Sequence, residues 1–125
     1  MYKLEKIGET HFYLKVLGTF PPSVAERFIT EFNEKTKELE EFSVIVDGLD
    51  FILLNLKSFD IILDFLKKNN ERLVRSAYIV ADNPVLNKEA EILLLRADSP
   101  KRKLVANFDE AKEWIGIGKI LIEKD

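Results

Sequence analysis

The spacing of apolar residues along the chain switches between two periods, which predicts strands that alternate with helices. Residues 2–7 and 11–17 alternate apolar and polar positions, as strands with one buried face do, and the short connection at 8–10 predicts an antiparallel hairpin. From Val24 to Leu39 apolar side chains recur at helical spacing between charged residues, which predicts an amphipathic helix on one face of a sheet.

The rest of the chain repeats a strand followed by a helix. Three short apolar runs are typical of buried parallel strands: residues 42–46, 77–81 and 104–108. A stretch with helical periodicity follows each of them: residues 58–70, 85–97 and 110–115. The predicted order is β-β-α-β-α-β-α-β-α, which indicates an α/β fold in a single domain, with a mixed, mostly parallel β-sheet flanked by helices. We expect this domain to occupy residues 1–125, with 117–125 as a C-terminal extension.

Turn and capping residues mark where these elements begin and end. Asp47-Gly48 is a turn signal directly after the strand at 42–46. Ser58, Asn83 and Asp109 each precede or open a helical pattern, so we predict that they are helix caps.

Composition and charge exclude several classes of protein. The chain has 125 residues, of which 46% are hydrophobic and 33% charged, as in ordinary globular proteins. A net charge of −3 without a broad basic footprint argues against nucleic-acid binding, and we expect the Lys101-Arg102-Lys103 cluster to be solvated. Without cysteine, disulfide scaffolds, thiolate zinc sites and thiol nucleophiles are excluded. No apolar run approaches the roughly 20 residues of a transmembrane segment, so we expect a cytoplasmic location.

The sequence carries few signs of catalysis, and we expect neither an enzyme nor a cofactor or metal. His11 is the single histidine, and no glycine-rich phosphate loop is present. Asp47 and Asp50 flank the predicted turn at the end of a strand, where α/β proteins often place their sites. Such carboxylates either work as an acid–base pair or satisfy the amides of the turn, and we favour the second interpretation.

An apolar segment, Phe51 to Leu54, falls in the predicted connection before the second helix, where polar residues are usual. It either forms a buried irregular turn or lines a groove for an apolar ligand or a partner, and we favour burial.

Three features of the sequence point to a known family: the element order, the segment VIVDGLDFILLNLKSFDIILDFL at 44–66 and the closing EAKEWI at 110–115. On these features the chain resembles a STAS domain of the SpoIIAA-like branch found in bacteria. In anti-sigma-factor antagonists of that superfamily, the central strand ends in an aspartate, and a partner kinase phosphorylates a serine at the next helix start. By resemblance, Asp47 matches this aspartate, whereas Lys57 stands at the serine position and Ser58 follows it. Ser58 is then either a phosphorylation site or simply a helix cap.

The resemblance implies a non-enzymatic regulatory module that binds a protein partner through residues 49–62. The residues that we expect at the binding site are Asp47, Asp50, Phe51, Leu54, Lys57, Ser58, Phe59 and Ile62. The alternative follows from the likeness of this branch to the CRAL-TRIO lipid-binding fold: a carrier of a small molecule or lipid, whose apolar pocket is flanked by residues 51–54, 59–66 and 86–97. The apolar tail at 117–122 suggests an edge strand or a subunit contact, and hence a homodimer.

Overall fold

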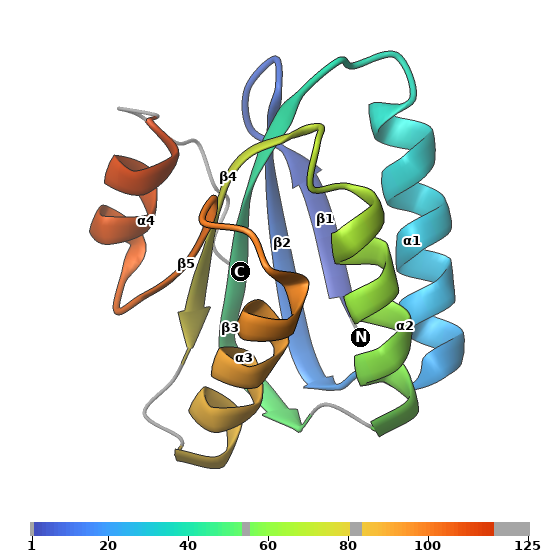
Figure 1. The fold of residues 1–125 in the computed structure, drawn as a ribbon, viewed down its shortest axis with the longest axis vertical. Coiled ribbons are helices and arrows are strands. Elements are labelled where there is room, and N and C mark those ends of the chain that lie inside the picture. The colour runs from blue at the N-terminus through green and yellow to red at the C-terminus, as the bar shows by residue number, and fades with distance from the viewer. Residues whose placement is uncertain (1, 54–55, 81–83, 117–125) are drawn as a thin grey trace.

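The computed structural model describes residues 2–53, 56–80 and 84–116 (Figure 1). It confirms the predicted α/β class and the predicted order of the elements. In chain order these are β1 (Tyr2–Lys6), β2 (His11–Thr19), α1 (Pro22–Thr36), β3 (Phe42–Leu53), α2 (Leu56–Lys68), β4 (Leu73–Val80), α3 (Pro84–Ala97), β5 (Arg102–Val105) and α4 (Phe108–Ile115).

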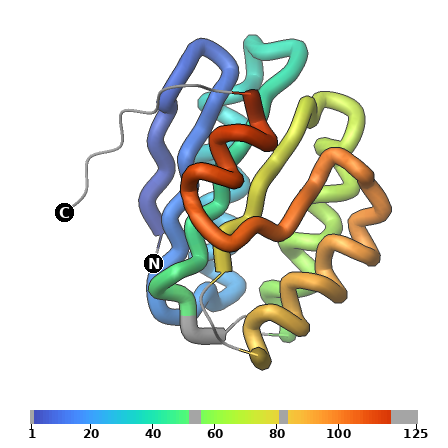
Figure 2. The backbone as a smooth tube through the Cα atoms, turned by 90° about the vertical axis from the view of Figure 1, so that its left-hand side faces the viewer, coloured from blue at the N-terminus to red at the C-terminus, as the bar shows by residue number. Residues whose placement is uncertain are grey.

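The strands lie side by side in the order β1-β2-β3-β4-β5, which is also their order along the chain. β1 pairs with β2 in antiparallel fashion, and the other neighbours are parallel. Each parallel strand lies next to the one before it, on the same side along the sheet. When all the connections are right-handed, this places the crossover helices on the same face of the sheet. Accordingly α1, α2 and α3 cover one face, and α4 lies on the other, against β3, β4 and β5 (Figures 1 and 2).

The sheet separates two apolar clusters, which follow from the alternation of side chains along each strand. The larger cluster lies under α1–α3 and is rich in phenylalanine; the ring of Phe32 lies 5.0 Å from that of Phe42 and 5.4 Å from that of Phe65. The smaller cluster lies between the sheet and α4 and includes Tyr13 and Ile45.

The central strand β3 is longer than predicted, and the predicted turn at Asp47-Gly48 is wrong. β3 runs on to Leu53, and Gly48 pairs with Val80 of β4. The Asp47 carboxylate, which would cap a turn, instead accepts hydrogen bonds from the Tyr13 hydroxyl and from the backbone N–H of Leu49, the latter at 3.0 Å. Pairing with a strand on each side therefore overrides the local preference of Asp-Gly for a turn.

A β-bulge in β3 reverses which residues face each side of the sheet. Lys15 of β2 aligns with Asp47, but Leu17 aligns with Asp50, so β3 holds an extra residue between these pairs. Side chains alternate strictly along a regular strand, and one inserted residue exchanges the two faces beyond it. Asp50 consequently shares the α4-bearing face with Lys15, and Phe51 turns to the face under α1–α3.

β4 and β5 both begin earlier than the apolar runs at 77–81 and 104–108. β4 starts at Leu73 and β5 starts at Arg102. The added residues include Ser76, whose backbone N–H donates to the Lys101 carbonyl at 2.9 Å, and Arg102 itself, and both side chains are buried. The apolar pattern missed these positions because the polar side chains point into the protein.

Two predicted helix caps are wrong, and a third lies outside the described residues. α2 begins at Leu56, so Ser58 sits inside its first turn and does not precede it. α4 is capped by Asn107 and not by Asp109, because the Asn107 side chain accepts the Glu110 backbone N–H at 2.9 Å. Asn83 and the extension at 117–125, with its predicted edge strand or subunit contact, belong to the part of the chain that is not described.

Candidate functional site

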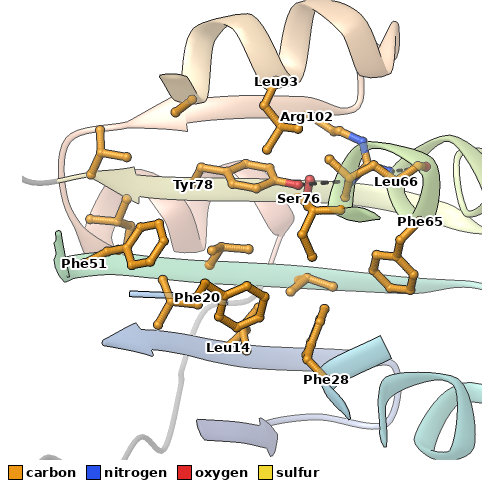
Figure 3. Close-up of a pocket in the computed structure, with 18 of the residues that line it drawn as sticks. Leu14, Phe20, Phe28, Phe51, Phe65, Leu66, Ser76, Tyr78, Leu93 and Arg102 are labelled. Atoms are coloured by element: carbon orange, nitrogen blue, oxygen red, sulfur yellow. Dashed lines mark hydrogen bonds between the residues drawn. The ribbon is translucent and has the colours of Figure 1, made fainter. Parts of the chain in front are cut away.

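An apolar cavity of about 140 Å³ lies between the sheet and helices α1–α3 (Figure 3). Side chains from the sheet and from all three helices form its walls. Among them are Leu14, Val16, Val44, Val46, Phe51, Phe28, Ile62, Phe65, Leu66, Leu86, Ala90 and Leu93. Protein interiors are close-packed and hold few voids larger than a water molecule, so a cavity of this size is a distinctive feature of the fold.

Two small residues make room for this cavity. Ala90 stands on the inner side of α3 between the larger Leu86 and Leu93, and Gly48 lies on the sheet floor. A Cβ atom at Gly48 would lie 3.0 Å from the carbonyl oxygen of Ile79, so the strand tolerates a larger residue there poorly.

The exposure of the lining residues shows which end of the cavity is closer to solvent. Phe51 and Val80, near the carboxyl ends of β3 and β4, are partly exposed, and so is Ile62 on α2. Leu73 and Ser76, near the opposite strand ends, are buried. We therefore call the end at the carboxyl edge of the sheet the mouth of the cavity, and the end at Leu73 and Ser76 its inner end.

The inner end is polar and is organised by Arg102, a residue only 9% exposed. Its Nη1 donates to the Tyr78 hydroxyl at 3.1 Å, and its Nη2 donates to the Leu66 carbonyl at 2.8 Å. Nε and Nη2 both donate to the Asn70 side-chain oxygen, at 3.3 and 3.0 Å. All of these acceptors are neutral.

Two buried polar atoms on the cavity lining have no hydrogen-bond partner among the described residues. One is Ser76 Oγ, in a residue that is 1% exposed, and the other is Glu89 Oε1 on α3. Buried polar groups normally find a partner, so each of these atoms marks a place where a ligand atom would be favourable.

Of the predicted site residues, Asp47 and Asp50 lie on the sheet face opposite the cavity. Asp47 is 4% exposed and bonded to Tyr13, and burial together with this hydrogen bond raises the pKa of the Tyr13 phenol above its usual value. Asp50 is exposed and pairs with Lys15 at 3.3 Å. Neither carboxylate lines the cavity, so the two do not form an acid–base pair within it.

Of the predicted site residues, Phe51 and Ile62 line the cavity. The ring of Phe51 lies 6.5 Å from that of Phe20. Phe59 is buried under the Arg96 guanidinium, which lies 5.7 Å from the ring centre. Lys57 is exposed. Leu54 lies outside the described residues.

Ser58 is fully buried, and its hydroxyl has no hydrogen-bond partner among the described residues. Phosphorylation at Ser58 stays a prediction, and here it requires the first turn of α2 to move, because solvent does not reach the hydroxyl.

Sequence reasoning missed the polar end of the cavity. Ser76 and Tyr78 stand two residues apart in β4, and they therefore share a face. Arg102 belongs to the basic cluster that we expected to be solvated, and its burial corrects that expectation. The available signal was the alternation of the hydroxyl-bearing Ser76 and Tyr78 with the apolar Ala77 and Ile79, which a wholly apolar strand would not show.

The described residues hold no group of three or more His, Cys, Asp or Glu side chains placed to bind a metal ion. No helix within the described ranges is both long and apolar enough to cross a membrane.

Comparisons with known proteins identify the fold. No protein-family model and no curated protein matches the sequence. An uncharacterised protein of the DUF3478 family from Shewanella loihica PV-4, with a SpoIIAA-like fold, superposes with a TM-score of 0.70 at 13% identity, over 91% of each chain. The anti-sigma factor antagonist SpoIIAA in its unphosphorylated form superposes with a TM-score of 0.65 at 11% identity, over 93% of this chain and 98% of that one. The chain therefore has the SpoIIAA-like fold, as the sequence predicts.

Proposed function

We propose that this chain is a non-enzymatic module of SpoIIAA-like fold that binds a small apolar molecule in the cavity under α1–α3. The cavity is the observation that carries the proposal. It coincides with the pocket that the alternative interpretation of the sequence expected, between Phe51 and the helices at 59–66 and 86–97. This position supports the carrier interpretation over the protein-binding one.

The cavity has a substantial energetic cost. A closed cavity lowers stability by about 24 cal/mol per Å³, so about 3 kcal/mol is the upper limit for this cavity, which is partly open. Total stability of a domain is only about 5–15 kcal/mol, so this is a large fraction of it. A bound apolar molecule restores the missing contacts, and this gain supports ligand binding as the reason why the cavity persists.

The volume of the cavity sets the size of the ligand. A dry apolar cavity of about 150 Å³ accommodates benzene, and the cavity of about 140 Å³ is of similar size. This favours a single ring or a short branched chain over a long-chain lipid.

The test is thermal denaturation with toluene as the probe. The wild-type melting temperature should rise with toluene concentration, because a ligand that binds only the folded state stabilises it. Ala90→Leu fills the cavity and should remove the toluene effect. Leu95→Phe adds volume on the same helix at a residue that is 79% exposed, and should retain the effect.

Native mass spectrometry of protein purified gently from its own cells provides the second measurement. We expect an added small mass that is present in the folded state, disappears on denaturation, and is missing from Ala90→Leu. No toluene effect and no added mass in the wild-type protein would contradict the proposal.

A protein partner, bound through residues 49–62, is the second candidate. The observation that favours it is a set of exposed apolar side chains near the mouth of the cavity: Leu49 is 43% exposed, Leu56 80% and Val85 62%. The similar structure of SpoIIAA, an anti-sigma factor antagonist, supports a regulatory role of this kind.

The partner surface is tested with variants that leave the cavity intact. Leu56→Asp and Lys57→Asp change exposed residues and should weaken partner capture while the circular dichroism spectrum stays unchanged. Leu95→Asp is the matched control, since it changes an exposed leucine near the C-terminal end of α3, outside the proposed surface. If both variants at the start of α2 still capture the partner, this surface is excluded. Phe51→Asp is less suitable, because Phe51 lines the cavity.

A further inference from the structure

We propose that the ligand of this cavity is a small apolar carboxylic acid, whose carboxylate is bound at the inner end by Arg102, Ser76 and Tyr78. The inference rests on the proposed function and names the ligand class. Ligand pockets are typically apolar with a few placed polar groups that fix orientation, and the cavity has this character at its inner end.

The charge of Arg102 favours an anionic ligand. This guanidinium is buried and lines the cavity, yet no carboxylate among the described residues forms an ion pair with it. Buried charges are normally paired, because an uncompensated charge in a medium of low dielectric constant is costly. The carboxylate of a ligand would supply the missing opposite charge.

Two hydrogen-bond donors, on Arg102 and Tyr78, have no acceptor among the described residues. An arginine donates from Nε, Nη1 and Nη2. Asn70 and Leu66 take up Nε and Nη2, and Nη1 donates to Tyr78, which leaves one N–H of Nη1. Tyr78 accepts this bond through its oxygen, so its own proton is available for donation.

Ser76 supplies a further donor, since it is 1% exposed and its hydroxyl has no hydrogen-bond partner among the described residues. Ser76 and Tyr78 lie on the same face of β4, and Figure 3 shows the Tyr78 hydroxyl directed along the strand toward Ser76 and Arg102. Three donors thus converge on one end of an otherwise apolar cavity. A carboxylate accepts several hydrogen bonds at once, and charge-assisted bonds are the strong ones.

Glu89 is the charged group on the lining that opposes an anion. It stands one helical turn before Leu93, which lies beside Arg102 in Figure 3, and α3 runs from the mouth toward the inner end. Glu89 is therefore nearer to the mouth, it is partly exposed, and it forms no ion pair with Arg102. It provides a control, because a ligand with an ammonium group would need it.

The experiment compares probes of one shape and different charge by calorimetry and thermal denaturation of the full chain. Benzoate carries the carboxylate, benzamide and toluene are neutral, and benzylamine is a cation. We expect benzoate to bind at least about tenfold more tightly than benzamide, the size expected of a charge-assisted hydrogen bond.

Variants then assign the preference to the three residues. Ser76→Ala and Tyr78→Phe should each weaken benzoate binding several-fold, and by a clearly larger factor than they change toluene binding. Arg102→Met should abolish the preference for benzoate; because Arg102 also holds Leu66 and Asn70, the two milder variants carry the test if Arg102→Met fails to fold. Glu89→Gln should leave benzoate binding unchanged or strengthen it.

The possible outcomes separate the ligand class from the proposed function. If toluene and benzamide bind as tightly as benzoate, the cavity binds apolar molecules but the carboxylate site is wrong. If benzylamine binds best and Glu89→Gln abolishes its binding, the ligand is a cation, which also overturns the inference. If no probe binds to the wild-type protein and Ala90→Leu behaves in the same way, the proposed function itself fails.

Discussion

Replacing Ser58 by alanine should stabilise the protein, although a serine at a helix start usually acts as a cap. Its hydroxyl is fully buried in the first turn of α2 and has no hydrogen-bond partner among the described residues. An unsatisfied buried polar group costs about 1–3 kcal/mol. Alanine also has the higher helix propensity, by about 0.5 kcal/mol. The expected gain in the free energy of unfolding is therefore about 1.5–3.5 kcal/mol.

Urea denaturation followed by fluorescence measures this change, since the chain has a single tryptophan. The indole of Trp114 donates to the Ser76 carbonyl at 3.0 Å, so its emission reports on α4 packed against the sheet. Ser23→Ala is the matched control, because Ser23 also lies in the first turn of a helix, α1, but is exposed. It should gain no more than about 0.5 kcal/mol, from helix propensity alone.

A loss of stability in Ser58→Ala, in place of the expected gain, would refute this reasoning. A helix cap loses about 1 kcal/mol on replacement by alanine, so a destabilised Ser58→Ala would show that the hydroxyl has a partner after all. Ser58→Asp, as a mimic of phosphorylation, should destabilise by more than about 3 kcal/mol, because it buries a charge. If Ser58→Asp is as stable as the wild-type protein, the first turn of α2 opens readily and a phosphorylation switch gains support.

Three further predictions concern the sheet and its edge. The pKa of Tyr13 is raised in the folded state, so its contribution to stability is complete below the ordinary tyrosine pKa of about 10 and is lost as the pH rises beyond it. Urea denaturation at increasing pH should show that Tyr13→Phe loses less stability above about pH 10 than the wild-type protein does. An equal loss of stability in the two proteins would contradict the bond to Asp47. Phe51→Ala should lower the free energy of unfolding by about 2 kcal/mol because the ring packs at the cavity. Asp50→Ala should change it by less than about 1 kcal/mol, since its ion pair is exposed; equal losses in the two variants would contradict the bulge. Leu56→Asp should leave stability within about 0.5 kcal/mol, as a side chain that is 80% exposed has little packing to lose, and a larger loss would show that the residue is covered.

The sequence by itself determined the class of the fold and the order of its elements. Strand and helix periodicities are local properties, set by which face of each element is buried, so they are visible in the chain without knowledge of its neighbours. The stripe of Phe28 and Phe32 predicted α1, and the apolar run at 42–46 predicted the central strand. The suggestion that residues 59–66 and 86–97 flank a pocket came instead from the resemblance to the CRAL-TRIO lipid-binding fold.

Only the tertiary structure decided where the individual site residues point. A bulge of one residue in β3 sends Phe51 into the cavity and Asp50 to the other face, and no local pattern marks that position because the bulge depends on pairing with β2. Burial of Ser58 and Arg102 likewise depends on elements distant in sequence: the guanidinium is held by Leu66 and Tyr78. Local chemistry fixes what an element is, whereas the contacts between elements fix which of its polar atoms remain available to a ligand.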